Sequence, residues 1–223
     1  MTTPTRTPTD TLSEQPQPAD RQATNAVPLQ MAELVLKTAN FDEMSAWYTH
    51  LLGHGPFFTR TPDPDRAPRP AGMPERAVDV RLAFFEVHDN GHPHHQVLAI
   101  FGVDSLAGVQ PSGPGLHHFQ FGVDGLDDLI AQYEHMMAGG AVPHRTANHG
   151  QATSFYFRDP DANVIEFSCS NFPTWQQESD FMGSAVFAAN PSGLELEHAD
   201  FARRYHSGEP RESLLSVEPG PFA

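Results

Sequence analysis

Two short apolar segments of the chain contain side chains that could bind a metal ion. Residues 115–121 read Gly-Leu-His-His-Phe-Gln-Phe and residues 163–167 read Asn-Val-Ile-Glu-Phe, so both have the composition of a buried strand. A buried imidazole or carboxylate is costly unless it is paired or coordinated to a metal. His118 and Glu166 are therefore the first candidates for a paired or metal-bound site.

An internal repeat predicts the elements that position these residues. A shift of 85 residues superposes residues 32–55 on 117–140, and a shift of 67 residues superposes 97–100 on 164–167. The difference of 18 residues predicts an insertion in the first unit, and the Pro- and Arg-rich stretch 60–76 is its expected place. Each unit shows a strand, an amphipathic helix with apolar spacings of three and four, and then several strands. Two such units must pack together to bury their apolar faces.

The same alignment relates the candidate ligands to one another. It makes Glu33 equivalent to His118, and Ala99 equivalent to Glu166. Because side chains alternate along a strand, His95 shares a face with Ala99 and points to the same space. The repeat therefore predicts that the candidate groups converge between the two units.

One His with two carboxylates and open coordination positions suits Fe(II), Mn(II) or Zn(II). Open positions would let a substrate and O2 bind side by side. The competing interpretation is a β-rich protein with neutral His residues and surface carboxylates, which needs no metal.

Composition limits the partners and the location. The chain of 223 residues has 28 acidic and 13 basic side chains and a net charge of −15, which argues against nucleic acid or an anionic membrane surface as a partner. Cys169 is the only cysteine, so no internal disulfide can form. We expect a reducing, cytoplasmic location. No apolar run has the length of a transmembrane helix, and the N-terminus lacks the apolar core of a signal peptide.

The sequence also predicts how the chain is divided. Residues 1–28 are rich in Thr, Pro, Gln and Asp, which is typical of a disordered tail. The remaining predicted parts are a first module at 29–110, a second module at 111–172, a C-terminal helical extension at 173–212 and a tail at 213–223.

Three segments resemble the vicinal oxygen chelate superfamily. They are His-His-Gln-Val-Leu-Ala from residue 94, Gly-Leu-His-His-Phe from residue 115, and the stretch 148–166 with its Ser-Phe-Tyr and Asp-Pro-Asp-Ala-Asn motifs. The superfamily includes glyoxalase I, bleomycin- and fosfomycin-resistance proteins and type I extradiol dioxygenases. The resemblance covers residues 29–212 and is greatest to the dioxygenase branch. It implies an α+β fold of two tandem βαβββ modules that form a mixed, cleft-shaped sheet with flanking helices.

The resemblance implies a role for each matching residue. His118 and Glu166 correspond to metal ligands, and His95 corresponds to an acid–base residue near bound oxygen. Tyr156 corresponds to a residue that hydrogen-bonds a catechol oxygen. His149 corresponds to a substrate contact, with His144 as the alternative for that role.

Two departures from the family pattern stand out. The family has His on the first strand of the first module, where this chain has Glu33 as the third expected ligand. The turn Asp-Pro-Asp-Gly-Asn has Ala162 in place of Gly. If that position needs a positive φ, Ala costs about 1 kcal/mol there.

The expected activity is that of a metal-dependent extradiol dioxygenase that cleaves a catecholic aromatic substrate with O2. Fe(II) is the favoured metal, with Mn(II) or Zn(II) as alternatives, and the fold is compatible with a homodimer. One alternative is an isomerase or lyase in which Glu33 acts as a base. Another is a non-catalytic protein that binds a small molecule, for which an acid–base His would have no use.

Overall fold

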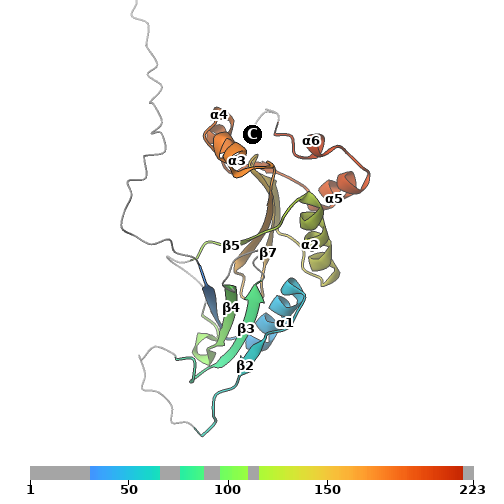
Figure 1. The fold of residues 1–223 in the computed structure, drawn as a ribbon. Coiled ribbons are helices and arrows are strands. Elements are labelled where there is room, and N and C mark those ends of the chain that lie inside the picture. Colours follow the sequence, from blue (N-terminus) through green and yellow to red (C-terminus); the bar gives the residue numbers. More distant parts are fainter. Residues whose placement is uncertain (1–30, 66–75, 88–95, 110–115, 218–223) are drawn as a thin grey trace, which may run out of the picture. The chain divides into compact units, whose positions relative to one another are not determined.

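The structure is a computed structural model that describes residues 31–65, 76–87, 96–109 and 116–217 (Figure 1). The predicted N-terminal tail, most of the predicted insertion at 60–76 and the end of the C-terminal tail lie outside the described residues. The strands are β1 (Glu33–Thr38), β2 (Phe58–Arg60), β3 (Arg81–Val87), β4 (Gln96–Gly102), β5 (Phe119–Gly122), β6 (Arg145–Asn148), β7 (Ala152–Arg158), β8 (Val164–Ser170) and β9 (Leu194–Glu195). The helices are α1 (Phe41–Leu52), α2 (Leu126–Ala138), α3 (Trp175–Met182), α4 (Ala185–Ala189), α5 (His198–His206) and α6 (Arg211–Leu214), with a 3-10 turn η1 (Asp104–Leu106).

The strands form two mixed sheets, each flanked by a helix of its own unit. The first sheet has the order β1-β4-β3-β2 and the second has the order β5-β8-β7-β6-β9. In each sheet one parallel pair, β1 with β4 or β5 with β8, is followed by antiparallel pairs. The element order is β-α-β-β-β twice, which confirms the predicted α+β class with two separate mixed sheets.

The strand register confirms the internal repeat at the level of single residues. Leu34 pairs with Leu98 in the first sheet, and Phe119 pairs with Ile165 in the second. The first pair is converted into the second by the shifts of 85 and 67 residues that align the sequence. Sequence similarity and backbone pairing therefore describe the same two-fold repeat.

Helices α1 and α2 cover the apolar face of their sheets because each has one buried stripe. The stripe contains Met44, Tyr48 and Leu51 in α1, and it contains Leu129 and Met136 among others in α2. Acidic residues occupy the first turn of both helices, where carboxylates stabilise the free N–H groups. The two stripes and the facing strand residues belong to one continuous apolar core.

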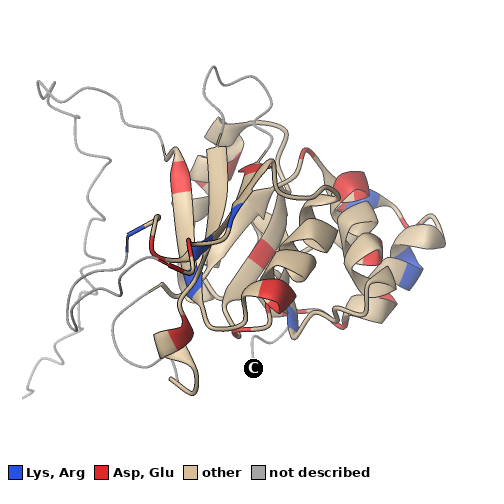
Figure 2. Ribbon diagram, turned by 90° about the horizontal axis from the view of Figure 1, so that it is seen from below, with Lys and Arg blue, Asp and Glu red and all other residues tan. Residues whose placement is uncertain are grey.

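The segment after β8 adds a strand as well as helices to the second sheet. β9 pairs with β6 through Ala147–Glu195 and Asn148–Leu194. Phe201 in α5 is buried in the common core, so this segment is packed onto the second unit. Acidic positions are spread over the helices and strands rather than gathered in one place (Figure 2). Among the described residues, no helix is both long and apolar enough to cross a membrane.

The turn between β7 and β8 has the strain that the sequence predicts conditionally. Ala162 has a φ of 65°, in the left-handed region that favours glycine. Asp159 holds the turn, because its carboxylate accepts hydrogen bonds from the backbone N–H groups of Asp161 and Asn163.

Candidate functional site

Four polar side chains form a row across one face of the second sheet. Arg145 in β6 pairs with Tyr156 in β7, Tyr156 pairs with Glu166 in β8, and Glu166 pairs with Gln120 in β5. Residues directly opposite one another in a sheet point to the same face. The opposite face carries apolar side chains, including Phe155 and Ile165, that belong to the core. The candidate site therefore lies on the sheet face away from α2.

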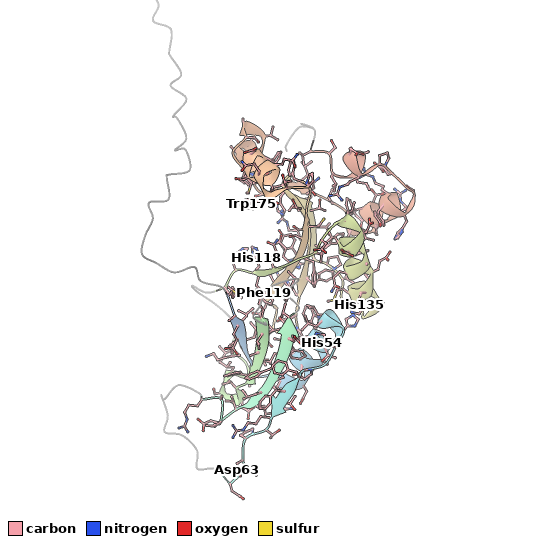
Figure 3. All side chains as sticks on the ribbon, in the orientation of Figure 1. His54, Asp63, His118, Phe119, His135 and Trp175 are labelled. Carbon is pink, nitrogen blue, oxygen red and sulfur yellow. The ribbon has the colours of Figure 1, made fainter. Side chains whose placement is uncertain are left out.

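His118 and Glu166 meet on this face, as the sequence predicts. His118 lies just before β5 (Figure 3), and its Nε2 atom is 3.1 Å from Oε2 of Glu166. The Glu166 side chain is only 7% exposed, and the His118 side chain is 34% exposed. Nδ1 of His118 lies 2.6 Å from Nδ1 of His117, which fixes the orientation of the ring. A buried carboxylate and an oriented imidazole thus share one small volume.

The donor atoms of this pair suit a divalent metal ion. Two ligands that each lie about 2.1 Å from one metal and at right angles to each other are separated by about 3 Å. The Nε2–Oε2 distance of 3.1 Å agrees with that arrangement. An imidazole nitrogen and a carboxylate oxygen are also the donor types that Fe(II), Mn(II) and Zn(II) accept.

Tyr156 lies beside the pair and is held in its protonated form. Burial, followed by the charge of Glu166, raises the pKa of Tyr156 to about 12. Its hydroxyl is 2.8 Å from Nε2 of His149, and its ring meets the His118 ring edge to face at 6.1 Å. The phenol can therefore act as a hydrogen-bond donor close to the candidate metal ligands.

His149, in the loop between β6 and β7, is suited to accept that proton. Burial lowers the pKa of His149, Arg145 lowers it further, and Glu166 opposes the shift. The ring also hydrogen-bonds the backbone carbonyl of Pro191. A neutral imidazole that donates to Pro191 through Nδ1 accepts the Tyr156 hydroxyl at Nε2.

His144 lies farther from the Tyr156 hydroxyl end of the site. Its ring centre is 6.4 Å from that of Tyr156, and no direct hydrogen bond joins the two side chains within the described part of the chain. Desolvation lowers the pKa of His144, with smaller effects in the same direction from Arg158 and Arg145. The geometry favours His149 over His144 as the partner of Tyr156.

Arg145 is a site residue that the sequence interpretation missed. Its guanidinium carbon lies 5.1 Å from the centre of the Tyr156 ring. Nε donates to Oε1 of Glu195 at 2.8 Å, and Nη2 donates to the carbonyl of Ser192 at 2.8 Å. No motif marks this arginine in the sequence, and only its register opposite Tyr156 identifies it.

Two expected members are not part of the described cluster. Glu33 lies in β1, is exposed, and pairs in register with Val97, which is the position equivalent to that of His118. His95 lies outside the described residues. Within the described ranges, no group of three or more His, Cys, Asp or Glu side chains is close enough to hold a metal ion. The third ligand therefore stays a prediction.

The equivalent row of the first sheet is entirely apolar. It consists of Phe58, Phe84, Ala99 and Val35, paired in that order across β2, β3, β4 and β1. The Phe58 and Phe84 rings are 5.4 Å apart, and Phe58 is partly exposed. The repeat has thus placed polar groups on one sheet and aromatic groups at the matching positions of the other.

Comparison with known proteins assigns the family. The chain belongs to the Glyoxalase/Bleomycin resistance protein/Dioxygenase superfamily, whose family model matches residues 30–167. This confirms the resemblance seen in the sequence motifs.

Two curated relatives are from Rhodococcus globerulus. Biphenyl-2,3-diol 1,2-dioxygenase 2 is 27% identical over 83% of this chain and 86% of its own length. Biphenyl-2,3-diol 1,2-dioxygenase 3 is 28% identical over 83% of this chain and 87% of its own length.

A solved structure has the same fold. The glyoxylase/bleomycin resistance protein/dioxygenase domain from Frankia sp. EAN1pec superposes with a TM-score of 0.51 and 18% identity, over 67% of this chain and 96% of that domain.

Proposed function

We propose that this protein is a metal-dependent extradiol-type dioxygenase that cleaves the ring of a catecholic aromatic substrate with O2. The observation that carries the proposal is the 3.1 Å contact between His118 and Glu166, with the Tyr156 hydroxyl beside it. The two relatives named for the 1,2-dioxygenation of biphenyl-2,3-diol support the same reaction class. The apolar row of the first sheet supports an aromatic substrate, since aromatic rings pack well against Phe side chains.

In this proposal His118 and Glu166 hold Fe(II), with Mn(II) or Zn(II) as alternatives, and Glu33 is the third ligand. The metal, when bound, supplies a template for two adjacent substrate oxygens and a path for electrons to O2. A second carboxylate in place of His adds negative charge and favours retention of a divalent cation.

The chain's own residues orient the substrate and move its protons. Tyr156 donates a hydrogen bond to a catechol oxygen, and its raised pKa keeps that proton in place. His149 is neutral because of its lowered pKa, so it can accept a proton from the Tyr156 hydroxyl or from the substrate. His95 is the proposed acid–base residue on the oxygen side.

Oxygen uptake tests the reaction. Protein loaded with Fe(II) under argon is mixed with air-saturated buffer and 2,3-dihydroxybiphenyl or catechol, and O2 consumption and the yellow ring-cleavage product are recorded. We expect activity in the wild type, loss of at least a hundredfold in H118A and E166Q, and a smaller loss in Y156F. E212Q, at an exposed position of α6, is the control that keeps full activity. If iron-loaded wild type consumes no O2 with any catechol, the proposal is wrong.

Metal analysis tests the third ligand separately. Protein purified without chelators is compared with its E33A and E33H variants by elemental analysis. If Glu33 is a ligand, iron content falls in E33A and is retained in E33H. Equal iron content in wild type and E33A would remove Glu33 from the site. An isomerase or lyase would instead show turnover that does not depend on O2.

A further inference from the structure

Arg145 has a free edge directed at the candidate site. Its Nε and Nη2 atoms bind Glu195 and the Ser192 carbonyl, and no hydrogen bond of Nη1 to a described residue is found. The guanidinium lies over the Tyr156 ring, and its side chain is 30% exposed. Two of the three nitrogen atoms are therefore used to hold the group in place, and the third is available to a ligand.

The Glu195 carboxylate does not cancel the charge of Arg145 at the site. The Glu195 side chain is 67% exposed, so water and salt screen its charge. An arginine stays protonated under all ordinary conditions. Arg145 thus presents a permanent positive charge to the polar row, while Glu195 lies on its outer side in β9.

The polar row needs such a charge if its ligand is an anion. Glu166 is buried and contributes a carboxylate beside Tyr156. Adding a phenolate next to a buried carboxylate is costly unless cations offset it. A bound metal would supply one cation, and Arg145 is the cationic member of the row on the other side of Tyr156.

We propose that Arg145 is a further substrate-binding residue that stabilises the deprotonated form of a phenolic or catecholic ligand, and that Glu195 is its positioning residue. The proposal rests on the proposed function, because it assumes a catecholic ligand between Tyr156 and the metal ligands. It assigns the C-terminal strand β9, which lies outside the span matched by the family model, a part in substrate binding.

A coloured catechol can report ionisation without turnover. The probe is 4-nitrocatechol, whose visible absorption band changes when a hydroxyl loses its proton. It is titrated under argon into Fe(II)-loaded wild type, R145Q, R145K, E195A and E195Q across a range of pH. R204Q removes the same charge from a comparable Arg–Glu pair, Arg204 with Glu209, and is the matched control.

The expected results separate charge from folding. In R145Q the dissociation constant rises about tenfold, and the ionisation midpoint of the bound probe rises by about one pH unit. R145K retains part of the effect because it keeps the charge. E195A weakens binding and ionisation about threefold, and E195Q restores most of the loss because its amide oxygen still accepts from Nε. R204Q matches wild type.

Two outcomes would overturn the proposal in different ways. If the bound probe has the same spectrum and ionisation midpoint in wild type, R145Q and E195A, Arg145 only fastens β9 to β6. If R145Q fails to fold by circular dichroism, R145K and the E195A–E195Q pair decide the question. If wild type binds no probe at all, the proposed function fails instead.

Discussion

His50 and His135 stack face to face where α1 meets α2, and each ring binds the backbone carbonyl of the other residue. The ring centres are 4.3 Å apart, and the Nε2–O distances are 3.0 Å and 2.5 Å. Because a carbonyl oxygen only accepts, each Nε2 carries its proton. The 85-residue shift aligns these two residues, so the contact lies on the local two-fold relationship between the modules.

This contact predicts an unusual pairing of substitutions. A Cβ added at Gly139 would lie 2.0 Å from Nε2 of His50, so G139A must displace the stacked ring. We expect G139A to lower the free energy of unfolding by about 1–2 kcal/mol, the combined value of a hydrogen bond and an aromatic contact. Urea denaturation followed by circular dichroism measures the change.

The double variant provides the decisive comparison. H50A removes the ring that Gly139 faces, so adding G139A to H50A should cost almost nothing. The φ of Gly139 is −83°, so the backbone itself accepts alanine. Additive effects of the two substitutions would show that the His50 ring is not fixed against Gly139.

Some of these features were predictable because they depend on local or periodic signals. The repeat predicted that Leu34 and Phe119 hold equivalent positions, and the strand register agrees. The cost of burying His118 and Glu166 predicted their contact. Both inferences need only the period of strands and helices and the chemistry of burial.

Other features depend on tertiary geometry that no period reveals. Arg145 becomes a site residue only because β6 and β7 pair in one register, which a slip of one residue would reverse. The stacking of His50 on His135 depends on the packing of α1 against α2. The two separate sheets, in place of one, likewise follow from hydrogen bonding between strands rather than from their sequences.

The strained turn at Ala162 predicts a stabilising substitution. With φ at 65°, Ala162 is in a region where L side chains are strained, and glycine relieves that strain. We expect A162G to raise the free energy of unfolding by about 0.5–1 kcal/mol, even though glycine also loosens the unfolded chain. As a control, A46G inside α1 should lower stability by about 1 kcal/mol. A destabilised A162G would contradict the strain.

Tyr48 predicts a link between the modules that weakens at alkaline pH. Its hydroxyl donates to Oδ2 of Asp159 at 3.0 Å, and both residues are buried. Burial, followed by the charge of Asp159, raises the pKa of Tyr48 far above its usual range. A raised folded-state pKa contributes stability fully below the unfolded value near 10, and this contribution falls as the pH rises above it.

Removing the hydroxyl should therefore have a pH-dependent effect. We expect Y48F to lower stability by about 1–2 kcal/mol at pH 7, because Asp159 loses a buried donor. Above about pH 10 the wild type should lose stability faster than Y48F, so the two converge. Y205F, whose hydroxyl binds Asp127 at an exposed site, is the control with a small effect. Parallel unfolding curves of wild type and Y48F at pH 7 and pH 11 would show that Tyr48 does not titrate as expected.

His118 and Glu166 predict that metal stabilises the folded protein. A ligand that binds only the folded state at about 100 times its dissociation constant adds about 2.7 kcal/mol. Adding Fe(II) under argon to chelator-treated protein should therefore raise the melting temperature of wild type, and H118A and E166Q should show no such rise. His206 and Glu134 form a comparable pair at 2.5 Å on the surface, so H206A should respond as wild type does. An equal rise in wild type and E166Q would mean that the metal binds elsewhere.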